Sequence, residues 1–265
     1  LDESGRAKQV TFINRLTGKA EQLNAQIIVL AASACETARI LLNSRTNERP
    51  NGVANSSGQV GRNLMDSTGA NFGGHIPALE GRPRYNEDGN TGNHIFIPWW
   101  GHKAQARGEL DFPRGYHFEL GGGFTPPGAY VAGADSGYGV ALKERIRRHY
   151  GAGLGMALRG EMLPNPLCYM DIDERVKDKW GIPLAKFHWR WSDHEINQVA
   201  HGQRTAGKII ELLGGKLGDA EQSPEDAIKK GGEIIHEVGT TRMGTNAKES
   251  VTNEWGKHGM YQTYM

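Results

Sequence analysis

The residue of this chain that is best suited to proton transfer is His236. It lies between the apolar pair Ile234 and Ile235, which is typical of a strand, and a turn marked by Gly239. The unperturbed pKa of histidine is about 6.5, so an imidazole on such a rigid support can act as a general base near neutral pH. The alternative is a buried histidine satisfied by a backbone carbonyl, which is the commoner state of a lone histidine.

Two further polar side chains lie on a segment with the alternation of a β-strand. From Arg114 to Leu120 apolar and polar residues alternate, so His117 and Glu119 share one face. An imidazole next to a carboxylate can hydrogen-bond a polar ligand. The alternative is that this pair simply faces solvent.

The sequence lacks the pattern of a metal site or of a disulfide framework. Its two cysteines, Cys35 and Cys168, are far apart and have no ligand-like spacing with histidines. His194 and His201 share one face of an expected helix, but no third ligand follows them at helical spacing. We therefore predict no metal site and interpret both histidines as surface residues.

Composition indicates a globular chain with balanced charge. Its 31 basic and 30 acidic residues leave a formal net charge of +1, which gives no electrostatic footprint for nucleic acid. The longest apolar run, Ile27 to Ala32, falls far short of the ~20 residues that span a bilayer. We expect no nucleic-acid partner and no membrane span in this chain, and the sequence does not indicate a localisation.

The apolar run leads into the start of a predicted helix. Residues Gln22 to Ala32 read as the second strand of a hairpin, and Ser33 with Glu36 three residues later has capping-box spacing. A buried strand that enters a helix presents free backbone N–H groups and a positive dipole end, which suit an anionic or polar ring edge. Most such junctions bind nothing, so this signal is weak by itself.

Further along, the pattern predicts a sheet followed by a long helix. Glycine and aromatic residues rise between Gly73 and Gly160, which favours a broad antiparallel sheet. A helix is predicted from a cap at Ser192 or Asp193 through Leu213. The Gly151–Gly155 stretch has Met156 where a dinucleotide loop needs its last glycine, so it predicts no phosphate site.

Several of these segments together resemble the glucose-methanol-choline (GMC) flavin oxidoreductases. The stretch around His236 is similar to the histidine motif of that family. Its second flavin-binding region and the loop after it are similar to Leu30 to Ala34, followed by Asn55 to Gly58 and Val60 to Asp66. The matching segments of the C-terminal region are Glu161 to Pro166, Asp171 to Asp173 and Lys177 to Pro183. The resemblance covers most of the chain and is nearest to bacterial sugar and gluconate dehydrogenase-like members.

The sequence departs from the family pattern at two positions. Ser33 stands where the family usually has glycine, and Ser67 stands where a histidine commonly follows the aspartate. Close backbone approach of a cofactor at Ser33 is put in doubt by this change.

The resemblance implies an FAD-dependent oxidoreductase that acts on CH–OH groups of sugars, glycosides or sugar acids. His236 would take the hydroxyl proton while hydride passes to the flavin. Flavin contacts are implied at Ala31, Ala32, Ser33 and Asn63, and substrate contacts at His117 and Glu119. The electron acceptor stays open between oxygen, quinone, a dye and a haem subunit, so an acceptor subunit is one of the alternative partners.

The resemblance also implies a mixed α/β fold with three stretches. Residues 1–72 would be part of a Rossmann-like FAD-binding domain, residues 73–230 a substrate-binding domain with a large antiparallel sheet, and residues 231–265 a return to the first domain. A pyrophosphate loop is expected before Leu1 and a second catalytic residue beyond Met265, so the chain reads as a fragment.

Two rival functions remain open. One is a non-catalytic carbohydrate-binding sheet domain, which is favoured by the pairs Trp99–Trp100 and Trp189–Trp191 and by the glycine-rich loops. The other is a truncated chain with no activity of its own.

Overall fold

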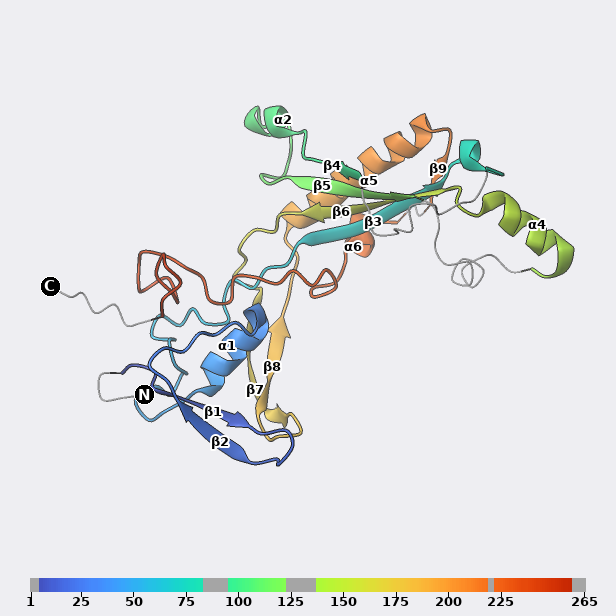
Figure 1. Ribbon diagram of the computed structural model, residues 1–265. Helices are drawn as coiled ribbons and strands as arrows, with labels where there is room; N and C mark the ends of the chain where they lie inside the picture. Colours follow the sequence, from blue (N-terminus) through green and yellow to red (C-terminus); the bar gives the residue numbers. More distant parts are fainter. Residues whose placement is uncertain (1–4, 83–94, 123–136, 219–221, 259–265) are drawn as a thin grey trace. The chain divides into compact units, whose positions relative to one another are not determined.

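The computed structural model describes residues 5–82, 95–122, 137–218 and 222–258, which form two compact units. The first unit combines Leu1–Asp66, Pro164–Arg190 and His236–Met265, and the second combines Ser67–Leu163 and Trp191–Ile235. Figure 1 labels the helices and strands of both. The predicted mixed α/β class with an antiparallel sheet is confirmed.

The second unit is built on a five-stranded antiparallel sheet. Its strands follow the order β4-β5-β6-β3-β9, and each neighbouring pair is antiparallel. The strands are β3 (Thr68–His75), β4 (Ile95–Ile97), β5 (Tyr116–Gly122), β6 (Gly153–Gly160) and β9 (Lys216–Leu217).

Helix α5 (Asp193–Leu212) covers one face of this sheet (Figure 1). It begins with a capping box between Ser192 and Glu195, so the helix predicted from its caps is confirmed. Gly202 lets the helix approach the sheet closely, because a Cβ at this position would lie 2.2 Å from Cδ1 of Leu158. The buried cluster between helix and sheet includes Phe72, Phe118, Met156, Leu158, Ala206 and Ile210.

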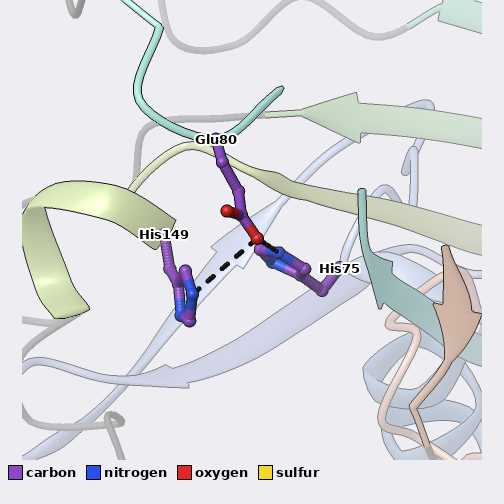
Figure 2. A group of neighbouring side chains, drawn as sticks. All are labelled: His75, Glu80 and His149. Atoms are coloured by element: carbon purple, nitrogen blue, oxygen red, sulfur yellow. Dashed lines mark hydrogen bonds and ion pairs between the residues drawn. The ribbon is translucent and has the colours of Figure 1, made fainter. Parts of the chain in front are cut away.

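The second unit also contains shorter helices. They are η1 (Pro77–Leu79), α2 (His102–Ala106), α4 (Gly139–His149) and α6 (Pro224–Ala227). At the C-terminus of α4, His149 lies beside Glu80 and His75, which Figure 2 shows as a cluster of side chains. Among the described residues no helix combines the length and the hydropathy needed to cross a membrane.

The described residues of the first unit form one helix and two hairpins. The hairpins are β1 (Gln9–Ile13) with β2 (Ala20–Asn24) and β7 (Tyr169–Lys177) with β8 (Pro183–His188). A hairpin was predicted at the first of these places, but its second strand ends at Asn24 and not at Ala32. Helix α1 (Ser33–Asn43) packs against β7 and β8, and their shared cluster includes Ala38, Leu41 and Met170.

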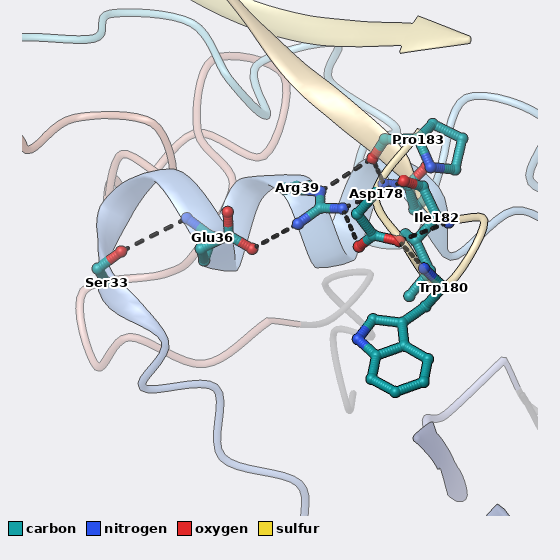
Figure 3. A network of polar contacts seen from close by, with 8 residues as sticks. Ser33, Glu36, Arg39, Asp178, Trp180, Ile182 and Pro183 are labelled. Carbon is teal, nitrogen blue, oxygen red and sulfur yellow. Dashed lines mark hydrogen bonds and ion pairs between the residues drawn. The ribbon is translucent and has the colours of Figure 1, made fainter. Parts of the chain in front are cut away.

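An ion-pair network fixes α1 to the turn between β7 and β8 (Figure 3). Arg39 donates to Oδ2 of Asp178 at 2.9 Å and to the carbonyl oxygen of Pro183 at 2.9 Å. The other carboxylate oxygen of Asp178 accepts the backbone N–H groups of Trp180 and Ile182. These contacts place Pro164–Arg190 in the first unit, whereas the expected substrate-binding stretch of residues 73–230 included them. The functional roles of the two units stay predictions.

Two strands that the sequence predicted, one just before Ser33 and one just before His236, are absent from the structure, so both predictions are wrong. The run before Ser33 has no hydrogen-bonded neighbour strand among the described residues, and Ile27 and Val29 are 82% and 81% exposed. A strand exists only with a partner, which a single apolar run cannot supply. Ile235 has a φ of 62°, which is incompatible with an extended backbone, so Ile234 and Ile235 form no strand either.

Candidate active site

His236 is held through its backbone while its side chain remains accessible. Its N–H donates to Oδ1 of the buried Asp66 at 3.0 Å, and the residue itself is exposed. Two residues further on, Val238 and Met65 exchange two backbone hydrogen bonds of 2.9 and 3.0 Å. The segment is therefore fixed against residues 65–66 without burying the imidazole.

The turn after His236 joins this segment to two others of the first unit. Gly239 has a φ of 96°, and a Cβ there would lie 1.9 Å from the carbonyl oxygen of Asn63, so only glycine fits. The buried Thr240 donates its hydroxyl to the carbonyl of Ala34 at 2.7 Å, and its own carbonyl accepts from Gly61 at 2.8 Å. The Asn63 loop, the first turn of α1 and the His236 segment are thus tied together.

Ser33 and Asn63, two of the residues expected at the flavin, both have left-handed backbones. Their φ values are 67° and 55°. Asparagine tolerates this region, but serine adopts it rarely, which explains why the resembled family favours glycine at the position of Ser33. The predicted capping box is wrong: Ser33 is the first residue of α1, Ala32 is its N-cap, and the Ser33 hydroxyl only reaches the Glu36 N–H at 3.5 Å.

The residues expected at a flavin lie where a polar ring edge could bind. Ala31 and Ser33 are exposed and Ala32 is half-buried, at the N-terminus of α1. The first N–H groups of any helix have no partner within the helix, and the helix dipole favours an acceptor there. This chemistry fits the carbonyl oxygens of a flavin.

His117 and Glu119 lie together on the sheet face opposite to α5. The alternation is as predicted, because Tyr116 and Phe118 are buried under the helix while these two side chains are half-buried on the other face. Nε2 of His117 is 3.4 Å from Oε1 of Glu119. Their cross-strand neighbours on this face are Arg159 and Ala157 of β6.

A cavity of about 410 Å³ opens at the His117 end of β5. It is lined by Phe96, Pro98, Trp99, Gly115, Tyr116, His117 and Glu161. The ring of Phe96 lies 5.7 Å from that of His117, so the cavity combines aromatic walls with an imidazole and a carboxylate. The sequence drew attention to the Trp99–Trp100 pair, of which Trp99 lines the cavity, but it did not indicate that Phe96 and Glu161 line it too.

Behind this cavity, His201 and His194 are structural rather than surface residues, so their interpretation as surface residues is wrong. Nδ1 of His201 is 2.6 Å from the hydroxyl of Tyr116, and His194 is buried with Nε2 2.9 Å from the carbonyl of Glu161. Burial raises the pKa of Tyr116 to about 12 and lowers the pKa of His201, so both groups are neutral at pH 7. Helix α5 is amphipathic, but its polar residues partly face the core.

Comparisons with known proteins indicate the family of enzymes that this chain resembles. Residues 164–261 match the family model of GMC oxidoreductase. The 2-methyl-1,2-propanediol dehydrogenase of Mycolicibacterium austroafricanum is 29% identical over 260 residues, which are 96% of this chain and 44% of that protein. The fructose dehydrogenase large subunit of Gluconobacter japonicus is 24% identical over 264 residues, 96% of this chain and 44% of that subunit.

A third relative is the gluconate 2-dehydrogenase flavoprotein of Pantoea cypripedii, which is 22% identical over 273 residues, 95% of this chain and 42% of that protein. The chain spans less than half the length of these relatives. The resemblance to the GMC oxidoreductases is confirmed, and the relatives named as dehydrogenases support an oxidoreductase.

Proposed function

We propose that this chain forms part of an FAD-dependent oxidoreductase that oxidises a CH–OH group of a sugar, glycoside or sugar acid. The observation that carries the proposal is His236, an exposed imidazole whose backbone is held by Asp66 and by the Gly239 turn beside Asn63. The names of two relatives, fructose dehydrogenase and gluconate 2-dehydrogenase flavoprotein, support the substrate class and the flavin.

In this proposal His236 acts as the general base. A bound FAD would accept the hydride of the carbinol carbon, and the hydroxyl proton must leave at the same time. A neutral imidazole can accept that proton as a general base. Asp66 is a positioning residue, because its carboxylate accepts the backbone N–H of His236 and so fixes the backbone from which the imidazole extends.

Ala31, Ala32, Ser33 and Asn63 are proposed to contact the flavin. They lie at the start of α1 and in the loop against Gly239, and both places connect to the His236 segment through Thr240 and Gly239. Backbone groups there can bond the polar edge of the isoalloxazine ring without a charged side chain.

His117 and Glu119 are proposed to bind substrate hydroxyls. A site built to pair hydroxyl groups penalises an analogue that lacks them, because its polar groups are then left buried and unpaired. The aromatic walls contributed by Phe96 and Trp99 supply apolar surface for the C–H face of a sugar ring.

The test uses His236→Ala in the complete enzyme, with the neighbouring Ile235→Ala as control because that side chain is 74% exposed and carries no chemistry. Loss of a general base typically slows a reaction about 10²- to 10⁴-fold. We expect single-turnover reduction of the flavin by substrate to slow by that factor in His236→Ala, with flavin still bound, and to be nearly unchanged in Ile235→Ala. Reduction within a factor of a few of the wild type in His236→Ala would rule out the role.

A non-catalytic carbohydrate-binding domain is the second candidate, and the cavity at His117 favours it. In this case the chain should bind sugar, and the affinity should be unchanged in His236→Ala and weaker in Trp99→Ala. The complete protein should show no flavin reduction by the sugar. Reduction of the flavin by a sugar excludes this candidate.

A further inference from the structure

Three side chains that can ligate a metal meet at one end of the sheet of the second unit (Figure 2). His75 is the last residue of β3, Glu80 follows η1, and His149 is the last residue of α4. One ligand atom from each of the three lies within 4.8 Å of the other two.

The distances between the ligand atoms are close to those of a tetrahedral site. Oε1 of Glu80 is 2.7 Å from Nε2 of His75 and 3.8 Å from Nε2 of His149. Metal–ligand bonds of about 2.0–2.2 Å in a tetrahedral zinc site place ligand atoms roughly 3.3–3.6 Å apart. The two distances lie on either side of that range, so an ion would require the first to lengthen and the second to shorten through side-chain rotation.

The backbone around the three residues is already fixed. The N–H of Gly81 donates to the carbonyl of Arg148 at 3.0 Å, which joins the residue after Glu80 to the one before His149. The N–H of Ile76, next to His75, donates to the carbonyl of Ala152 at 2.7 Å. Ligands that come from three elements are thus held at one place before any ion binds.

Arg148 orients the carboxylate. Its Nε donates to Oε2 of Glu80, which leaves Oε1 directed at the two imidazoles. Carboxylates that ligate metals are commonly held by such an outer hydrogen bond, which fixes the ligating oxygen. The His75, Glu80 and His149 side chains are 41%, 18% and 35% exposed, so an ion can enter from solvent.

We propose that His75, Glu80 and His149 form a binding site for a divalent transition-metal ion of the Zn²⁺ type. Two imidazoles and one carboxylate are ligands that zinc accepts, and they leave a fourth position for water. The site is independent of the proposed redox function, because none of its residues is assigned to flavin or substrate. The bound ion would join α4 to the end of β3.

The rival explanation is an ion-pair cluster without metal. Arg148 and the two imidazoles would then pair with the carboxylate of Glu80. Both explanations predict that Glu80→Gln weakens the attachment of α4, so only metal binding itself separates them.

The experiment titrates ZnCl₂ into the chelator-treated 265-residue chain by calorimetry, with Co²⁺ absorption as a second readout of tetrahedral ligation. We expect one ion per chain. His149→Ala and Glu80→Gln should each weaken binding by at least the 10- to 100-fold that loss of an outer-shell partner costs. Circular dichroism of each variant verifies that the fold is retained, and Glu80→Gln keeps the shape of the side chain if His149→Ala does not fold.

A matched control is needed because the chain contains ten histidines. His102 on α2 is exposed and lies outside the cluster, so His102→Ala should bind the ion as the wild type does. Absence of saturable binding in the wild type overturns the proposal. Equal losses in His102→Ala and His149→Ala would also overturn it, since they would indicate adventitious histidine binding.

Discussion

At the scale of single residues, Ser33 has a backbone conformation that its side chain disfavours. Its φ of 67° costs a non-glycine residue roughly 1–2 kcal/mol, while glycine loses roughly 0.5–1 kcal/mol more conformational entropy on folding. The hydroxyl contributes only the long 3.5 Å contact with the Glu36 N–H. We therefore expect Ser33→Gly to stabilise the first unit slightly, by up to about 1 kcal/mol, as measured by the midpoint of urea unfolding.

Ser44 at the other end of α1 provides the control. It has a φ of −81°, and its hydroxyl donates to the carbonyl of Ile40 at 2.7 Å. Glycine relieves no backbone strain at this position and removes that hydrogen bond, so Ser44→Gly should lower the midpoint of urea unfolding. A lower midpoint in both variants would mean that the conformation of Ser33 stores no strain.

Sequence patterns predicted which face a side chain lies on better than they predicted backbone conformation. The alternation around His117 and Glu119 is local and was predictable, as was the turn at Gly239. The left-handed conformation of Ile235 was not, because a β-branched residue adopts it only when surrounding contacts impose it. The role of His236 stays a prediction, since accessibility alone does not establish chemistry.

At the scale of elements, the contact between α5 and the sheet depends on Gly202. Alanine would gain about 1 kcal/mol of helix propensity there. Its Cβ would, however, lie 2.2 Å from Cδ1 of Leu158, so this fully buried side chain would have to shift within the core. Overpacking typically costs about 1–3 kcal/mol, so Gly202→Ala should leave the stability of the second unit unchanged or reduce it by up to ~2 kcal/mol.

The same helix contains the matching control. A Cβ at Gly207 would meet only Cδ2 of Leu217 at 3.8 Å, which is an ordinary contact. Gly207→Ala should therefore raise the thermal midpoint through helix propensity alone. If Gly202→Ala raised it equally, the close approach of α5 to β6 would be disproved.

The sequence predicted elements that depend on local signals, such as helix caps. It did not predict elements that depend on contacts with distant segments. The helix predicted from a cap at Ser192 or Asp193 through Leu213 agrees with α5 to within one residue. A strand needs a hydrogen-bonded neighbour, so the apolar run from Ile27 to Leu30 could not be assigned from its composition. For the same reason, the sequence did not predict the cluster of His75, Glu80 and His149, because its members come from three elements.

At the scale of the whole molecule, each unit is assembled from segments that are distant in sequence. The chain passes from one unit to the other after Asp66, Leu163, Arg190 and Ile235. Each unit has its own buried cluster, one between α5 and the sheet and the other between α1 and β7. Such a division cannot be predicted from boundaries in composition, because it depends on long-range packing.

Separate clusters predict separate responses to core mutations. Leu158 is fully buried in the second unit and Met170 nearly so in the first. Replacing either residue by alanine removes contacts worth about 2–5 kcal/mol. Hydrogen exchange should then accelerate in α5, β5 and β6 for Leu158→Ala, and in α1, β7 and β8 for Met170→Ala.

Exchange in the other unit should stay near the wild-type rate in each variant, since local opening follows the cluster that has been weakened. Residues of β1 and β2 serve as an internal reference, because this hairpin is exposed and contributes to neither buried cluster. Equal acceleration in both units for either variant would show that the chain unfolds as one cooperative body. Two distinct responses would instead mean that substitutions in the His117 cavity can be interpreted without loss of the segment that holds His236.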